Sequence, residues 1–328
     1  MKKLMVSMLC VVAWASFSSV QAEEKLKIGW VLAMANAPIV IAKEKGFFKD
    51  QGLEVDIIQF AEGPTVQQAM ATGQVDMAYI GAPPIYHWYA QGLKSKILAK
   101  VNYGQAAVIV NKTSGINSVK DLKGKKIAGV KKGSGMDVLL RGFVLGEHAE
   151  LKPDVDVSII SMPTGNMADS LEGKMVDAAF TWEPFTTQSL VRGNTKLILD
   201  TNKAIPNHLW YVVMALPQTL EKKRSAVVKA LQAHKKAVEF LNSSPTAGND
   251  IIIKTFSIEE ITGADGKKVT PAQIVGMARE RLGWAWNFTD SDKKFIQRMM
   301  NYSFNLGFLE TQLKAEDLLD MSLLADMK

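Results

Sequence analysis

The chain has 328 residues, of which 47% are hydrophobic and 22% are charged, a composition typical of a globular protein and unlike a disordered or collagen-like one. Cysteine occurs only at Cys10, which excludes a disulfide framework and, elsewhere in the chain, a Cys-based zinc site or thiolate nucleophile. The net charge is +6 and the basic residues are interspersed with acidic ones, so no nucleic-acid partner is predicted. At roughly 150 residues per domain, the length favours two domains.

The first 22 residues have the pattern of a secretory signal peptide. Lys2 and Lys3 precede an apolar stretch from Leu4 to Phe17, and small residues follow up to Ala22. That stretch is shorter than the roughly 20 residues that a transmembrane helix needs. We therefore predict export, with cleavage after Ala22 and removal of the only cysteine.

Strands and helices then alternate along the chain. Apolar residues with alternating or continuous patterns predict strands, and glycines or prolines punctuate them. The predicted strands are 25–32, 53–60, 75–80, 126–130, 155–160 and 176–180, and the predicted helices are 37–45, the segment opening at 63–65, 134–146 and 166–172. This order predicts an α/β fold built from βαβ units with mainly parallel sheets.

One segment is close to an internal repeat. Residues 73–83 and 173–184 both contain the pattern Asp-x-Ala-aromatic followed by a proline, after a glycine turn. Because each copy lies in the same strand and helix order, we predict two similar α/β lobes rather than one long sheet.

Beyond residue 216 the pattern becomes helical. Helices are predicted at 220–241, 271–282 and 290–306, with a polar loop at 261–269. This part of the chain offers little that indicates chemistry.

Short loops follow the predicted strands, and one of them has the features of an anion site. Ligands of open parallel sheets gather at the carboxyl ends of the strands, where N–H groups of the following helices are unpaired. Gly133 and Gly135 allow close backbone approach, Ser134 adds a hydroxyl, and Lys131 and Lys132 add positive charge. An ordinary strand–helix turn with Ser134 as helix N-cap also explains these residues, and the residues taken alone favour it.

The motifs together resemble a known family. The segment 118–128 followed by Gly133-Ser134, the opening 27–30, the segment 41–48, and the Gly81-x-Pro83 and Trp182-x-Pro184 loops resemble periplasmic solute-binding proteins of ABC importers. Within these, they are similar to the taurine, aliphatic sulfonate and nitrate branch, in the superfamily that includes thiamine-pyrimidine proteins.

The resemblance implies a two-lobe periplasmic-binding-protein fold of type II, closing over one small solute. Residues 23–105 with 210–328 would form the first lobe and residues 106–209 the second. Crossover strands near 102–110 and 209–215 would form the hinge. The implied partners are a small organic anion and an inner-membrane permease with its ATPase, for a monomeric periplasmic protein.

The resemblance implies neither an enzyme nor a cofactor or metal. A thiamine-pyrimidine synthase of this fold carries a cysteine-rich motif, and the chain after residue 22 has no cysteine. His87, His148, His208 and His234 lack the spacing of a hydrolase or zinc site. We expect His148 and His234 to be solvated.

The expected ligand is an alkyl or aryl sulfonate or a taurine-like compound, with nitrate and a thiamine-pyrimidine precursor as alternatives. Trp182 is the best candidate for an aromatic wall, whereas Trp30 and Tyr79 are equally explained as core. His208 stands where taurine-binding relatives carry an acid; Glu183 either replaces that acid or pairs with a lysine or with backbone N–H groups. The predicted ligand-binding residues are Met34, Asn36, Gly63, Thr65, Gly81, Ala82, Gln105, Ser134, Gly135, Met136, Trp182, Glu183 and His208.

Overall fold

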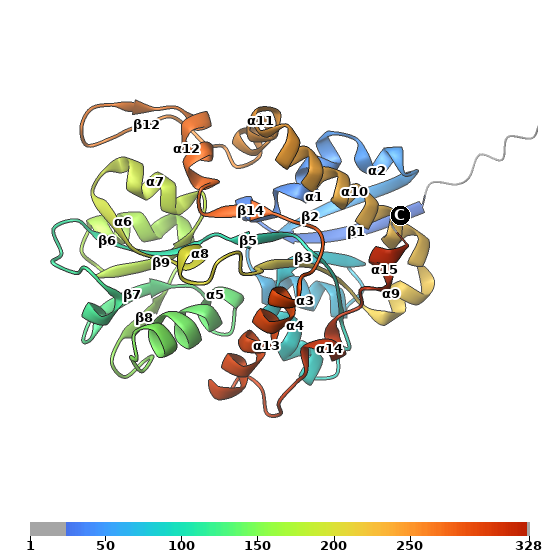
Figure 1. Cartoon of the computed structure of the whole chain (residues 1–328), viewed down its shortest axis with the longest axis horizontal. Coiled ribbons are helices and arrows are strands. Elements are labelled where there is room, and N and C mark those ends of the chain that lie inside the picture. The colour runs from blue at the N-terminus through green and yellow to red at the C-terminus, as the bar shows by residue number, and fades with distance from the viewer. Residues whose placement is uncertain (1–23, 327–328) are drawn as a thin grey trace, which may run out of the picture.

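A computed structural model describes residues 24–326 (Figure 1). The predicted signal peptide and its cleavage after Ala22 lie outside these residues. Within them, no helix combines the length and the apolar character required to cross a membrane.

The first sheet has five strands, in the order β2-β1-β3-β11-β4. β1 is parallel to both β2 and β3, whereas β11 is antiparallel to β3 and β4. The strands are β1 (Glu24–Val31), β2 (Leu53–Phe60), β3 (Met77–Gly81), β4 (Lys96–Lys100) and β11 (Tyr211–Ala215). The connecting helices are η1 (Met34–Asn36), α1 (Ala37–Glu44), α2 (Phe47–Asp50), α3 (Gly63–Ala71) and α4 (Ala82–Ala90).

The second sheet repeats this topology, with the order β10-β6-β9-β7-β8. β7 is parallel to β8 and β9, and β6 is antiparallel to β9 and β10. The strands are β6 (Ala106–Asn111), β7 (Lys126–Gly129), β8 (Ser158–Ser161), β9 (Ala178–Trp182) and β10 (Thr195–Asp200). Its helices are η2 (Val119–Leu122), α5 (Gly135–Val138), η3 (Leu139–His148), η4 (Thr164–Asn166), α6 (Met167–Glu172), α7 (Phe185–Arg192) and α8 (Thr201–Ala204). The predicted α/β class is confirmed.

The sequence repeat has a structural cause. Asp76 precedes β3 and accepts a hydrogen bond from Lys27 N at 2.9 Å. Asp177 precedes the equivalent strand β9 and accepts one from Lys126 N at 2.8 Å. Each aspartate thus fixes the entry of a strand beside the parallel strand it pairs with, β1 or β7, which explains why the same pattern occurs twice.

Two connections join the sheets. The predicted crossover at 102–110 is split into β5 (Asn102–Gly104) and β6 by Gln105, whose φ is 119°. β5 pairs with β14 (Leu282–Trp284), which crosses the middle of the molecule in Figure 1. The second connection leads the chain back into the first sheet as β11, after a β-bridge between Tyr103 and Leu209. The exact lobe boundaries remain a prediction.

Some predicted elements differ from the observed ones. The helix predicted at 134–146 continues beyond α5 as a π-helix, η3. The helix predicted at 220–241 is divided into α9 (Pro217–Lys222) and α10 (Arg224–Ser243), because Lys223 has a non-helical φ of −132° and its ammonium group contacts Asp76 at 2.8 Å.

Near the C-terminus, tertiary pairing overrides two predictions. The helix predicted at 271–282 ends as α12 (Pro271–Ala278), since Leu282 is drawn into β14, and the loop predicted at 261–269 contains a small hairpin. The remaining elements are α11 (Pro245–Thr255), β12 (Ile261–Thr262), β13 (Lys268–Val269), α13 (Asp290–Asn305), α14 (Ala315–Leu318) and α15 (Ser322–Ala325).

The expectation that His234 is solvated is wrong. α10 packs against the first sheet, so His234 is fully buried and its Nε2 lies 2.8 Å from the carbonyl oxygen of Lys100 in β4. Its ring also contacts Tyr79 at a centroid distance of 5.4 Å. His148, by contrast, is exposed.

Buried histidines predict a loss of stability in acid. Burial lowers the pKa of His87, His208 and His234 from 6.5 to about 4. As the pH falls from 6.5 towards 4, the unfolded chain therefore binds protons that the folded chain does not, and the free energy of unfolding decreases. Urea unfolding across this range should show the decrease, and His234→Gln should weaken it while the exposed-site control His148→Gln should not. An equal pH dependence in wild type, His234→Gln and His148→Gln would show that buried His234 does not cause the loss of stability.

Candidate functional site

A cavity of about 660 Å³ lies between the two sheets. Its lining includes the carboxyl ends of β1, β2 and β3 from the first sheet and of β7, β8 and β9 from the second. Parallel α/β sheets bind ligands at this edge. The cavity is therefore the candidate ligand site.

The structure brings several predicted ligand residues to this cavity and leaves others outside its lining. Those that line it are Gly63, Gly81, Ser134, Gly135, Met136 and Trp182. Those that do not are Met34, Asn36, Thr65, Ala82, Gln105, Glu183 and His208.

Two of the outlying residues have local structural roles on the first-sheet side. The Asn36 amide donates a hydrogen bond to the Val31 carbonyl oxygen at 2.8 Å. The Thr65 hydroxyl donates one to the Glu62 carbonyl oxygen at 2.7 Å. Met34 and Ala82 are buried in the core.

Glu183 is held by an ion pair behind the cavity. Its carboxylate accepts hydrogen bonds from Arg281 Nε and from Thr187 N, the latter at 3.1 Å. Burial raises the pKa of the Glu183 carboxyl above its usual range, and Arg281 opposes that shift. The structure thus places Glu183 in contact with an arginine, where the sequence left open a lysine, a backbone N–H group or a ligand amine.

Gln105 and His208 lie at the crossover. The Gln105 N–H donates to the Arg281 carbonyl oxygen at 3.0 Å, and its own carbonyl oxygen accepts from Glu183 N at 3.2 Å. His208 Nδ1 is 2.8 Å from the Ile205 carbonyl oxygen, and its ring packs against Phe295. Both residues connect segments around the cavity.

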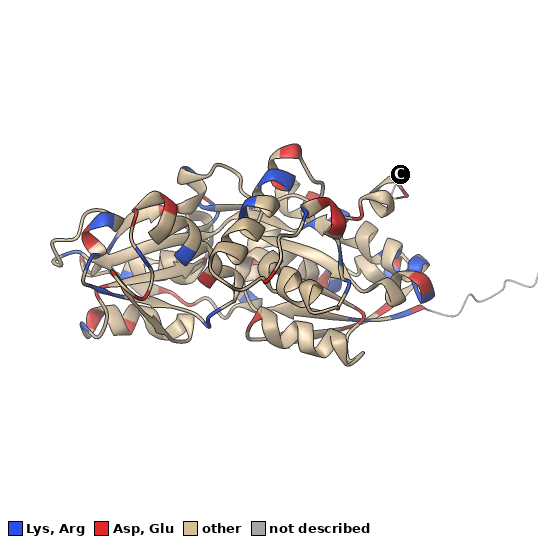
Figure 2. Ribbon diagram, turned by 90° about the horizontal axis from the view of Figure 1, so that it is seen from below, with Lys and Arg blue, Asp and Glu red and all other residues tan. Residues whose placement is uncertain are grey.

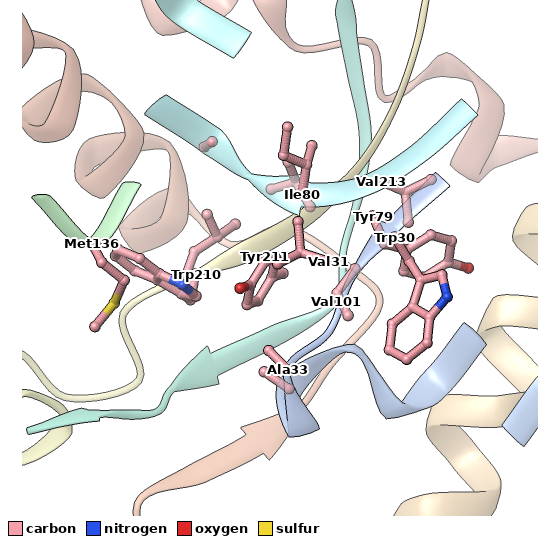
Figure 3. Close-up of a cluster of buried hydrophobic side chains, with 14 of the residues drawn as sticks. Trp30, Val31, Ala33, Tyr79, Ile80, Val101, Met136, Trp210, Tyr211 and Val213 are labelled. Carbon is pink, nitrogen blue, oxygen red and sulfur yellow. The ribbon is translucent and has the colours of Figure 1, made fainter. Parts of the chain in front are cut away.

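Aromatic residues missed by the sequence prediction form much of the wall. Phe60 ends β2, Phe185 begins α7, and Trp210 and Tyr211 stand at the entry to β11. Figure 3 shows Met136 and Trp210 together at one end of a buried cluster, with Trp30 and Tyr79 at the other. Only Phe185 had a usable sequence signal, since it directly follows the Trp182-x-Pro184 loop.

The serine and threonine hydroxyls of the lining lie on one side of the cavity. Ser134, Ser161 and Thr164 come from the second sheet and its helices. The first-sheet side contributes mainly apolar residues, and prolines at the starts of α3 and α4 remove helix N–H donors there. An anionic head group would therefore find its hydroxyl donors on the second-sheet side, which also contributes Trp182 and Phe185.

Ser134 both caps a helix and lines the cavity. Its hydroxyl oxygen accepts a hydrogen bond from Asp137 N at 3.3 Å, which leaves its O–H proton free to donate. Gly133 N donates instead to the Asp137 carboxylate at 2.9 Å. The N–H groups of Gly135 and Met136 open the helix and have no intrahelical carbonyl partner, so they are the candidate backbone donors.

The lysines near this turn are paired. Lys131 Nζ lies 3.0 Å from a carboxylate oxygen of Glu62, and Lys132 Nζ lies 3.9 Å from one of Asp154. Elsewhere, acidic and basic segments are interspersed, as Figure 2 shows. Within residues 24–326, no His, Cys, Asp and Glu side chains form a group of three that could hold a metal ion.

Substitutions in the Gly133–Met136 turn should have graded effects on ligand affinity. Ser134→Ala should cost about 1.5–3 kcal/mol, because a hydrogen bond to a charged group is lost while the backbone donors remain. Gly135→Val should cost more, because a Cβ added at this position would lie 3.4 Å from Pro83 and Trp210, and the larger valine atoms would enter the cavity. Titration calorimetry on folded variants measures this, and unchanged affinity in Gly135→Val would place the ligand elsewhere.

Comparisons with known proteins agree with this architecture. The family model described as the NMT1-like family matches residues 20–256. A Brucella abortus protein named as a binding protein is 29% identical, over 81% of this chain and 84% of its own.

Two solved structures share the fold. One is the periplasmic aliphatic sulphonate binding protein SsuA from Escherichia coli, with a TM-score of 0.75, 19% identity, and coverage of 91% of this chain and 92% of that one. The other is the alkanesulfonate-binding protein SsuA from Xanthomonas axonopodis pv. citri bound to MOPS, also with a TM-score of 0.75, at 18% identity and 91% and 98% coverage. The predicted type II periplasmic-binding-protein fold and the predicted family resemblance are confirmed, and the chain belongs to the NMT1-like family.

Proposed function

We propose that this protein is the solute-binding component of an ABC importer and that it captures an amphipathic organic anion, best matched by an alkyl or aryl sulfonate. The observation that carries the proposal is the cavity between the sheets, which joins a polar wall at Ser134, Ser161 and Thr164 to an aromatic one. A sulfonate head accepts hydrogen bonds from hydroxyl and N–H donors, while its organic tail needs an apolar surface.

The size of the cavity favours a bulky ligand. Its volume of about 660 Å³ lies within the range of small-molecule sites, and nitrate would leave most of it empty. MOPS, bound in one SsuA structure, is a sulfonate that carries a ring, and a ligand of that kind can place its sulfonate at the hydroxyls and its ring against the aromatic side chains. Trp182 and Phe185, whose rings meet edge to face with centroids 6.4 Å apart, offer a wall for such a ring.

Taurine itself fits less well, because its ammonium group needs a free acid. Glu183 is occupied by Arg281 and Thr187, and Glu62 by Lys131. A thiamine-pyrimidine precursor is the second candidate, because the same aromatic wall can hold a flat ring.

In this proposal the lobes 23–105 with 210–328 and 106–209 close around the ligand, and the closed form is recognised by a membrane permease with its ATPase. The protein acts in the periplasm as a monomer and releases its ligand unchanged. The relatives named above as binding proteins support transport rather than catalysis.

Thermal-shift screening tests the ligand class. The panel contains aryl and alkyl sulfonates, taurine, nitrate, carboxylates and thiamine-pyrimidine precursors. A ligand that binds only the folded state raises the melting temperature, and we expect the aryl sulfonates to raise it most. A shift with thiamine precursors and none with sulfonates would contradict the sulfonate assignment.

A further inference from the structure

We propose that Glu62 and Lys131 form a latch that holds the two halves of the protein together over the bound ligand. This inference rests on the proposed function, since it concerns the same cavity. It assigns these residues to retention of the ligand rather than to direct recognition of its charge.

The pair joins the two halves across the cavity. Glu62 follows β2 of the first sheet, and Lys131 follows β7 of the second, with 3.0 Å between Lys131 Nζ and Glu62 Oε1. Both residues line the cavity. Their side chains are 30% and 56% exposed, respectively, so the contact lies at the boundary between the cavity and solvent.

The local structure around Glu62 and Lys131 favours their role as a latch. Glu62 is the N-cap residue of α3, yet its side chain makes no capping hydrogen bond. The Lys131 carbonyl oxygen accepts from Ser134 N at 3.1 Å, which connects the lysine to the turn that carries the candidate anion donors. Closing the pair therefore draws together the loops that begin a helix on each side of the ligand.

The charges also balance. In the described part of the chain, the lining contains one carboxylate, Glu62, and one ammonium group, Lys131. Since each neutralises the other, the head group is left to the hydroxyl and backbone donors of the second-sheet side. The opposite arrangement, in which Lys131 binds the ligand directly, makes an opposite prediction for Glu62.

The test measures ligand release by stopped-flow tryptophan fluorescence, with the aryl sulfonate that gives the largest thermal shift. Glu62→Gln and Lys131→Met should each speed release about two- to fivefold, the range of a partly exposed ion pair. The double variant should be no faster than either single variant, and the charge swap Glu62→Lys with Lys131→Glu should restore slow release. Arg224→Met is the matched control, because it breaks an ion pair of 2.9 Å at similar exposure between α10 and Asp326, the residue after α15, away from the cavity.

A second readout needs no ligand. Small-angle X-ray scattering of the ligand-free protein should give a larger radius of gyration for Glu62→Gln than for wild type, because fewer molecules are closed. If wild type binds no compound of the panel, the proposed function fails and scattering alone decides on the latch. Unchanged or slower release in Glu62→Gln, or superimposable scattering curves, would overturn it, and slower release would identify Lys131 as a direct ligand contact.

Discussion

Replacing Arg281 by methionine is expected to lower the free energy of unfolding by about 3–5 kcal/mol, the usual cost of leaving one member of a buried ion pair alone. Glu183 is fully buried and Arg281 is only 11% exposed. Arg281 also donates to the Thr187 hydroxyl at 2.5 Å, and its carbonyl oxygen accepts from Gln105 N. Guanidinium chloride unfolding measures the change.

A double variant separates loss of charge balance from loss of packing. Glu183→Gln with Arg281→Met keeps an acceptor for Thr187 N and leaves no buried charge, so it should recover most of the stability. A loss below about 1 kcal/mol in Arg281→Met, as for an exposed pair, would show that the ion pair contributes little to the fold.

Trp182→Ala is expected to weaken sulfonate binding by about 2–4 kcal/mol, the cost of removing a buried aromatic anchor. The side chain ends β9 and lines the cavity beside Phe185. Its indole N–H is buried and has no hydrogen-bond partner among the described residues. Titration calorimetry on folded protein measures the loss.

Two variants control this experiment. Trp182→Phe keeps an aromatic wall without the N–H group, so it should lose much less affinity than Trp182→Ala. Trp88→Ala removes a partly buried tryptophan of α4 that does not line the cavity, and it should bind normally. Equal affinities for wild type and Trp182→Ala would remove Trp182 from the site.

Local patterns predicted the parts of the fold that depend on neighbours in sequence. The boundaries of β2 agree fully, because Leu53, Val55 and Ile57 alternate with polar residues over a half-buried strand. The repeat at Asp76 and Asp177 correctly indicated two similar sheets. The split of the crossover at Gln105 was not predictable, since it depends on Arg281, far away in the sequence.

The candidate site shows the same difference between features set by neighbours in sequence and features set by distant residues. Gly135, Ser134 and Trp182 were found because they stand in strand-end loops with turn residues. Trp210 and Tyr211 were missed as site residues because they enter the cavity from an antiparallel strand, through pairing of Tyr211 with Gly81. His234 was misjudged for a related reason, since the layer that buries it comes from distant strands.

The most direct test of the proposed sulfonate site is a crystal structure of the protein with the aryl sulfonate that gives the largest thermal shift. We predict one molecule in the cavity between the sheets, with its sulfonate oxygens within hydrogen-bond distance of Ser134 Oγ and of Gly135 N or Met136 N, and with its ring against Trp182 and Phe185. A ligand bound outside this cavity, or one whose sulfonate faces Phe60 on the first-sheet side, would contradict the proposed site.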